Sequence, residues 1–194
     1  MKKKITFITS NVGKVTSMRK YLSEIGYEVV RKELPMVEPQ ADTLEEVAIA
    51  KAKQAYEILK MPLVVQDSGF CIDALNNFPG PYTKYVVETI GVDGIIKIME
   101  NYEDRGCRFM QALTYVDENG SLITFTEDTE VGTIADTVDP YDHPDDWSSL
   151  WKIYIPEGYT TTLNHIIDKD DEKFHERKEK KAVFSQLAHW LKEK

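Results

Sequence analysis

The stretch KITFITSNVGKVTSMRKYLSEIG, residues 4–26, decides the fold class. It begins with a short apolar segment that stops at Thr-Ser-Asn. Val15, Met18, Leu22 and Ile25 then recur at helical spacing, and Gly26 ends the pattern. A strand that leads directly into a helix is the repeating unit of α/β proteins, so this stretch predicts a sheet covered by helices.

The rest of the chain continues the alternation of strands and helices. We predict strands at 27–33 and 61–66, around a helix that begins with the capping box Thr43-x-x-Glu46. Further on, the patterns predict the following elements: helices at 83–91 and 93–102, a hairpin of 107–116 with 121–127, a continuation of the sheet at 129–135, a strand at 150–158 and a C-terminal helix. The absence of a repeat or linker predicts one domain over residues 1–194.

Composition and charge narrow the function classes. The formal net charge of -9 argues against a protein that binds the nucleic-acid backbone. The two cysteines, Cys71 and Cys107, have no CxxC spacing, which disfavours a zinc cluster or disulfide framework and indicates two small core residues. The apolar stretch at 5–8 is too short for a signal peptide, and no run reaches membrane-span length. We therefore expect a cytoplasmic protein that binds no membrane.

The loop TSNVGK, residues 9–14, is a candidate phosphate site. It lies between a predicted strand and the start of a helix, where free backbone N–H groups and the helix dipole favour an anion. Asn11 can donate to phosphate oxygens, and Lys14 adds a positive charge. The alternative is that Ser10 or Asn11 only caps the helix. The loop lacks the GxxxxGK[ST] spacing of a Walker A motif.

The segment LVVQDSGF, residues 63–70, places Asp67 at the expected end of a strand. In open α/β sheets, ligands bind beyond the carboxyl ends of strands. The alternative is a simple turn, because Asp, Ser and Gly all favour turns. With Glu38 from the loop after the second strand, Asp67 would form an oxygen-rich site for Mg²⁺ and a substrate phosphate.

Three blocks of sequence together resemble the inosine triphosphate pyrophosphatase family: ITFITSNVGKV, QADTLEEV and VVQDSGFCIDALNNFPGPYTKYV. The third contains the family's DSGFxIxALxxFPGxY pattern, and the second is closest to the archaeal-like members. The resemblance implies an elongated, two-lobed α/β domain with a long mixed β-sheet flanked by helices and a central nucleotide cleft. It also implies a homodimer that uses Mg²⁺ to hydrolyse non-standard purine nucleoside triphosphates such as ITP, dITP and XTP.

The resemblance also assigns roles to individual residues. Glu38 matches a metal ligand, and Asp67 matches a metal ligand that is also the proton acceptor. The residues that match substrate contacts are Thr9, Ser10, Asn11, Lys14, Ser68 and Lys173.

Several positions depart from the family pattern. The family's acid before Asp-Ser-Gly is Gln66 in this chain, which offers a metal only a neutral oxygen. The family's GFGYDPIF is replaced by WSSLWKIY, residues 147–154, and its Ser-His-Arg falls on residues 177–179, Arg-Lys-Glu. The resemblance implies that the family's versions of these segments contact the base, so we expect the reaction to be retained and the substrate preference to be altered.

Trp151, within the first of these segments, has two interpretations. It can stack on a base, or it can share a core-facing side of a strand with Ile153 and Ile155.

The leading hypothesis is hydrolysis of a nucleoside triphosphate at the α-phosphorus, with release of pyrophosphate. Asp67 would position or deprotonate the attacking water. A second hypothesis is a nucleotide-binding or regulatory protein of the same fold with weak or no turnover. A third, a phosphatase or phosphotransferase with Asp67 as covalent nucleophile, is less favoured because QDSGF lacks an Asp-x-Asp pattern.

Overall fold

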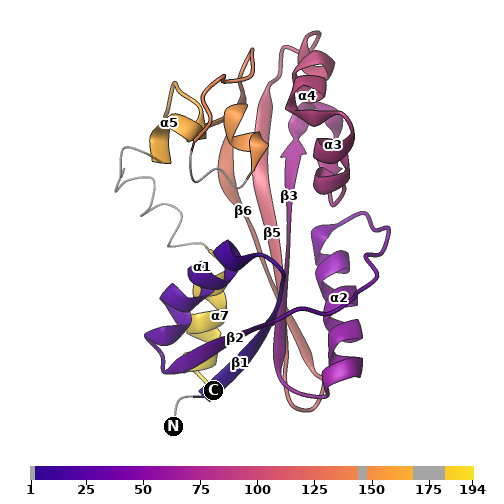
Figure 1. Ribbon diagram of the computed structural model, residues 1–194, viewed down its shortest axis with the longest axis vertical. Coiled ribbons are helices and arrows are strands. Elements are labelled where there is room, and N and C mark those ends of the chain that lie inside the picture. Colours follow the sequence, from indigo (N-terminus) through magenta and orange to yellow (C-terminus); the bar gives the residue numbers. More distant parts are fainter. Residues whose placement is uncertain (1–2, 144–147, 168–181) are drawn as a thin grey trace. The chain divides into compact units, whose positions relative to one another are not determined.

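The computed structural model describes residues 3–143, 148–167 and 182–194. Its strands and helices are shown in Figure 1 and have these bounds: β1 Lys3–Ile8, α1 Val12–Ser23, β2 Tyr27–Lys32, α2 Leu44–Leu59, β3 Leu63–Ile72, β4 Pro79–Gly80, α3 Thr83–Thr89, α4 Gly91–Met99, β5 Gly106–Val116, β6 Leu122–Ile134, β7 Tyr154–Pro156, α5 Leu163–Ile167 and α7 Val183–Lys192. Short 3₁₀ helices occupy Asp73–Leu75 and Ser149–Lys152. No helix in the described part of the chain is long and apolar enough to cross a membrane.

The strands form one mixed sheet in the order β2-β1-β3-β5-β6-β7, and β4 pairs with β3. β1 is parallel to β2 and to β3, whereas β4 and β7 pair antiparallel with their neighbours. The sequence-based prediction of an α/β fold with a mixed sheet and flanking helices is therefore confirmed. The chain divides into two compact units, to which β3, β5 and β6 each contribute residues.

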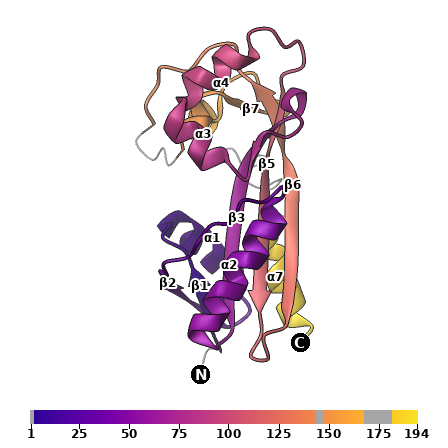
Figure 2. The same cartoon turned by 90° about the vertical axis from the view of Figure 1, so that its right-hand side faces the viewer.

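The first unit takes its described residues from Met1–Ser68, Gln111–Glu127 and Glu179–Lys194. In this unit α1 and α7 cover one face of the sheet and α2 covers the other, as Figures 1 and 2 show. Val64 of β3 packs in the core with α1 and α7, and its neighbours Leu63 and Val65 pack with Ala52 and Ala55 of α2. Alternate residues of β3 therefore face opposite helix layers, as the pleat of a strand requires.

The second unit takes its described residues from Gly69–Met110 and Asp128–Lys178. Its core includes Phe70, Tyr154 and Trp151, together with Val92, Ile95 and Met99 from the apolar face of α4 and its end. The rings of Phe109 and Tyr154 lie 5.0 Å apart in an edge-on arrangement, which is a favourable geometry for aromatic pairs. Cys71 and Cys107 are buried and unbonded to each other, as predicted for small core residues.

Several local predictions are confirmed. Thr43 and Glu46 form the complete capping box at the start of α2. The two helices at 83–102 meet at Gly91, whose φ of 67° lies in the left-handed region that glycine adopts without strain. The segments at 121–127 and 129–135 belong to the single strand β6.

Two local predictions are wrong. β3 does not end at Gln66 but runs through Asp67 and Ser68 to Ile72, because the apolar residues Phe70, Cys71 and Ile72 continue the buried strand. The predicted strand at 150–158 is a 3₁₀ turn followed by the short strand β7, so Trp151 does not share a strand face with Ile155.

Candidate functional site

The polar residues of the first unit gather beyond the carboxyl end of β1. β1 stops at Ile8, which lies opposite Val65 of β3. β3 continues past this point with Gln66, Asp67 and Ser68, so these residues have no β1 partner beside them. β2 and β3 lie on opposite sides of β1, and in α/β sheets such a reversal of strand order creates a crevice where ligands bind. Asp67 therefore has the position expected of a site residue, although it lies within a strand.

The loop from β1 to α1 is ordered by its own side chains. The Oγ1 of Thr9 accepts the N–H of Asn11 at 3.1 Å, and the Oδ1 of Asn11 accepts the N–H of Lys14 at 3.1 Å. Asn11 is thus the N-cap of α1, as the alternative interpretation of this loop expected. Ser10 is exposed, and Nη1 of Arg31 donates to its carbonyl oxygen at 3.0 Å. The helix cap uses the side-chain oxygen of Asn11. The side-chain amide N–H groups of Asn11 are therefore the donors that this residue can offer a ligand.

Lys14 links the start of α1 to β3. Its ammonium donates to the hydroxyl of Ser68 at 3.1 Å. Burial of the ammonium lowers the pKa of Lys14 to about 8; the carboxylates of Asp67 and Glu38 oppose this shift, and the Lys51 ammonium reinforces it. Lys14 is therefore a poorly hydrated cation beside a helix N-terminus, which is an arrangement suited to an anion.

Asp67 contacts a residue of α2, and its carboxylate also acts on the charge of Lys14. Oδ1 of Asp67 lies 3.3 Å from Nζ of Lys51, and the same ammonium lies 3.6 Å from Oε2 of Glu38. Burial raises the pKa of Asp67 above its usual value, even though the ammonium groups of Lys51 and Lys14 lower it. A buried carboxylate with a raised pKa is a better proton acceptor than an exposed one.

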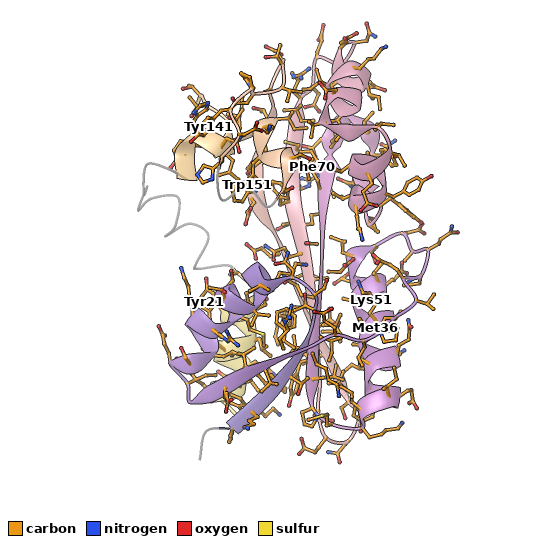
Figure 3. All side chains as sticks on the ribbon, viewed as in Figure 1. Tyr21, Met36, Lys51, Phe70, Tyr141 and Trp151 are labelled. Atoms are coloured by element: carbon orange, nitrogen blue, oxygen red, sulfur yellow. The ribbon has the colours of Figure 1, made fainter. Side chains whose placement is uncertain are left out.

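Lys51 is the residue that the sequence reasoning missed. It lies on α2 (Figure 3), one turn after Val47 and one turn before Ala55, both of which are buried. A lysine at a core-facing position of an amphipathic helix is unusual, because burial of an unpaired ammonium is costly. The core-facing position of Lys51 was therefore a signal in the sequence that pointed to a buried charge partner. The contacts with Asp67 and Glu38 explain how the lysine is accommodated there.

Gln66 takes a different environment from Asp67. Its Nε2 donates to Oε1 of Gln111 on β5, and its own Oε1 is buried without a hydrogen-bond partner among the described residues. Such an orphaned acceptor is costly, and sites of this kind are completed by water, an ion or a ligand. The side chain of Gln66 is therefore held beside the site by a second amide that the sequence did not indicate.

The oxygen donors fit a hard divalent cation. Glu38 and Asp67 lie close enough to share one cation, the Lys51 ammonium. Mg²⁺ prefers such oxygens and is typically held by one or two carboxylates plus substrate phosphates. No group of three or more His, Cys, Asp or Glu side chains suited to a metal occurs among the residues that the structure describes.

Two predicted substrate contacts are not among the described residues of the first unit. Trp151 belongs to the second unit, where it is 6% exposed within the hydrophobic core and its ring lies edge-on to that of His143 at 6.2 Å. This burial matches the interpretation of Trp151 as a core residue, and its contact with a base stays a prediction. Lys173 and residues 177–179 lie outside the described residues.

Comparison with known proteins identifies the family of the chain. Residues 5–187 match the Ham1 family. A dITP/XTP pyrophosphatase of Methanopyrus kandleri is 35% identical over 97% of this chain and 96% of its own length. The enzyme of the same name from Thermococcus kodakarensis is 34% identical over 98% of each chain. Among solved structures, a HAM1 protein of Coxiella burnetii superimposes with a TM-score of 0.79 at 20% identity over 99% of this chain and 100% of the other. The resemblance drawn from the sequence motifs is confirmed: the chain belongs to the Ham1 family.

Proposed function

We propose that the protein hydrolyses non-standard purine nucleoside triphosphates, such as dITP and XTP, to the monophosphate and pyrophosphate. The observation that carries this proposal is the pairing of an anion site, Lys14 with Ser68, and a carboxylate site, Asp67 with Glu38, past the end of β1. The relatives named dITP/XTP pyrophosphatases support the substrate class.

The anion site would hold the phosphate chain. Lys14 supplies a positive charge at neutral pH, and the start of α1 supplies backbone N–H groups and the positive end of the helix dipole. Thr9 and Ser10 belong to the loop that shapes this end, and Ser68 offers a hydroxyl that Lys14 already contacts. This arrangement orients the triphosphate relative to β3, which carries the proposed base.

Asp67 would act on the attacking water. In the protein without a metal, burial raises the pKa of the Asp67 carboxyl group, which favours its acceptance of a proton. A divalent cation, which we propose is Mg²⁺ held by Glu38 and Asp67, would supply charge neutralisation on the phosphate oxygens. Without a metal, Lys51 lies against both carboxylates and offsets part of their negative charge.

The proposal is tested by a substrate panel. Purified protein is incubated with Mg²⁺ and dITP, XTP, ITP and the ordinary nucleoside triphosphates, and released pyrophosphate is measured. We expect pyrophosphate from at least one non-standard purine nucleotide, at a rate well above that from ATP or GTP. Asp67→Asn is the matched control, because it keeps the shape of the side chain and removes the base. Absence of pyrophosphate from every nucleotide would refute the proposal.

Gln66 favours one alternative, a nucleotide-binding protein without efficient turnover. An amide replaces the family's acid at this position, and its buried oxygen carries no charge to hold a metal. This alternative predicts saturable nucleotide binding by calorimetry with negligible hydrolysis. In that case Gln66→Glu would raise turnover, whereas in an efficient enzyme it would not.

We also propose that the protein is a homodimer. Exposed aromatic side chains support this proposal: Tyr82 and Tyr85, one turn apart at the start of α3, are 40% and 68% exposed, and Phe78 just before them is 44% exposed. Exposed apolar groups of this size often mark protein contacts. Light scattering during gel filtration is expected to give twice the chain mass of 22.3 kDa, and a mass of one chain would refute the dimer.

A further inference from the structure

Lys51 places the chain's own positive charge where the two site carboxylates converge. Its Nζ lies 3.3 Å from Asp67 and 3.6 Å from Glu38. The side chains of Lys51 and Asp67 are only 15% and 12% exposed, whereas that of Glu38 is 56% exposed. The Lys51–Asp67 contact is therefore shielded from water, where the attraction between opposite charges is strongest.

The loop that carries Glu38 is fixed over Lys51 by α2 itself. Gln54, one turn after Lys51, accepts the N–H of Val37 with its Oε1 at 2.9 Å. Its Nε2 donates to the carbonyl oxygen of the same residue at 2.7 Å. Both backbone groups of Val37 are thus held by one side chain, which places the next residue, Glu38, against Lys51. The three charges are positioned by the fold and not by a chance surface contact.

A divalent cation at this site would compete with the Lys51 ammonium for the oxygens of Asp67 and Glu38. Mg²⁺ approaches carboxylate oxygens to about 2.0–2.1 Å, and an ammonium beside the same oxygens would repel it strongly. We propose that Lys51 occupies the metal position in the nucleotide-free protein and must leave the carboxylate pair before the metal is bound. This inference rests on the proposed function, because that function requires a metal at Glu38 and Asp67.

The consequence is a coupling between metal and nucleotide. When Lys51 leaves the carboxylates, its ammonium loses two partners in a shielded place, and this loss weakens the binding of metal alone. Phosphate oxygens held by Lys14 and the start of α1 would give the displaced ammonium a new anionic partner. Metal and triphosphate would then each strengthen the binding of the other, because such coupling is reciprocal.

The test measures metal binding without nucleotide and without turnover. Mn²⁺, which binds the same oxygen donors and is detected by electron paramagnetic resonance, is titrated into wild type, Lys51→Met and Lys53→Met. Lys53 is the matched control, because it is an exposed lysine on the same helix and its loss changes the net charge equally. We expect Mn²⁺ to bind Lys51→Met about tenfold more tightly than wild type, within the usual range of coupling between sites. Lys53→Met is expected to bind Mn²⁺ like wild type.

Equal or weaker Mn²⁺ binding by Lys51→Met would overturn the inference, and so would an equal gain in Lys53→Met. Lys51→Gln, which keeps a polar group at the end of the side chain, is measured beside Lys51→Met. Circular dichroism confirms that both Lys51 variants fold. The outcome is separable from the proposed function. A wild-type protein that releases no pyrophosphate refutes the function, whereas the comparison of Mn²⁺ affinities decides the role of Lys51 regardless of turnover.

Discussion

The titration of Lys14 makes the anion site testable in quantitative terms. Burial lowers the pKa of its ammonium to about 8, mainly because the folded chain removes water from around the charge. The pKa is lowered, so the ammonium is charged below about pH 8 and neutral above it. Affinity for a phosphate anion that relies on Lys14 must therefore fall as the pH rises through this value.

The size of the effect follows from the titration. With a pKa of about 8, about nine-tenths of the Lys14 side chains carry a proton at about pH 7, and about one-tenth do at about pH 9. If the protonated form alone binds, the affinity falls about tenfold across this interval. A lysine with the ordinary pKa of 10.5 would lose almost none of its charge over the same range.

The assay is a calorimetric titration with inorganic pyrophosphate at several pH values. Lys14→Arg is the control, because the guanidinium group stays protonated throughout this range. The ratio of the two dissociation constants cancels the ionisation of pyrophosphate itself. We expect this ratio to change about tenfold between about pH 7 and about pH 9. Parallel pH profiles for wild type and Lys14→Arg would show that pyrophosphate binding does not depend on the titration of Lys14.

Three further substitutions separate catalysis from stability. Asp67→Asn is expected to slow pyrophosphate release at least about 100-fold, the usual contribution of a general base. Burial raises the pKa of Asp67, so at pH values above the unfolded pKa its ionised form lowers the stability of the folded protein. The melting temperature of Asp67→Asn at neutral pH should therefore equal or exceed that of wild type. A large drop in melting temperature would contradict this. Trp151→Ala should lower the free energy of unfolding, measured with denaturant, by about 3–5 kcal/mol, because it empties a buried core position. The order of nucleotide preference should stay the same. A changed preference with unchanged stability would show that Trp151 contacts the base. Thr43→Ala removes the capping box of α2 and should lower the free energy of unfolding by about 1 kcal/mol, whereas an unchanged value would show that the cap contributes nothing.

The fold was largely predictable because its signals are local. The residue spacing of α1, the capping box of α2 and the break at Gly91 each act within one or two turns of chain, and the structure confirms all three. The extent of β3 was not predictable in this way. Asp-Ser-Gly has the composition of a turn, but pairing within the sheet keeps these residues extended up to Ile72.

The site was predictable in part for the same reason. Asn11, Lys14 and Asp67 belong to short motifs that can be recognised along the chain. Lys51 and Gln111 lie on other elements, and only the packing of α2 and β5 against β3 brings them to the site. A contact across elements depends on tertiary structure, so the carboxylate–ammonium group could not be found from spacing alone.

The proposed function depends on attack of water at the α-phosphorus of the nucleotide. The most direct measurement is hydrolysis of XTP or dITP in water enriched in oxygen-18, followed by mass spectrometry of both products. We expect the heavy oxygen to appear in the nucleoside monophosphate and the pyrophosphate to stay unlabelled. Label in pyrophosphate, or release of single phosphate groups, would contradict this expectation.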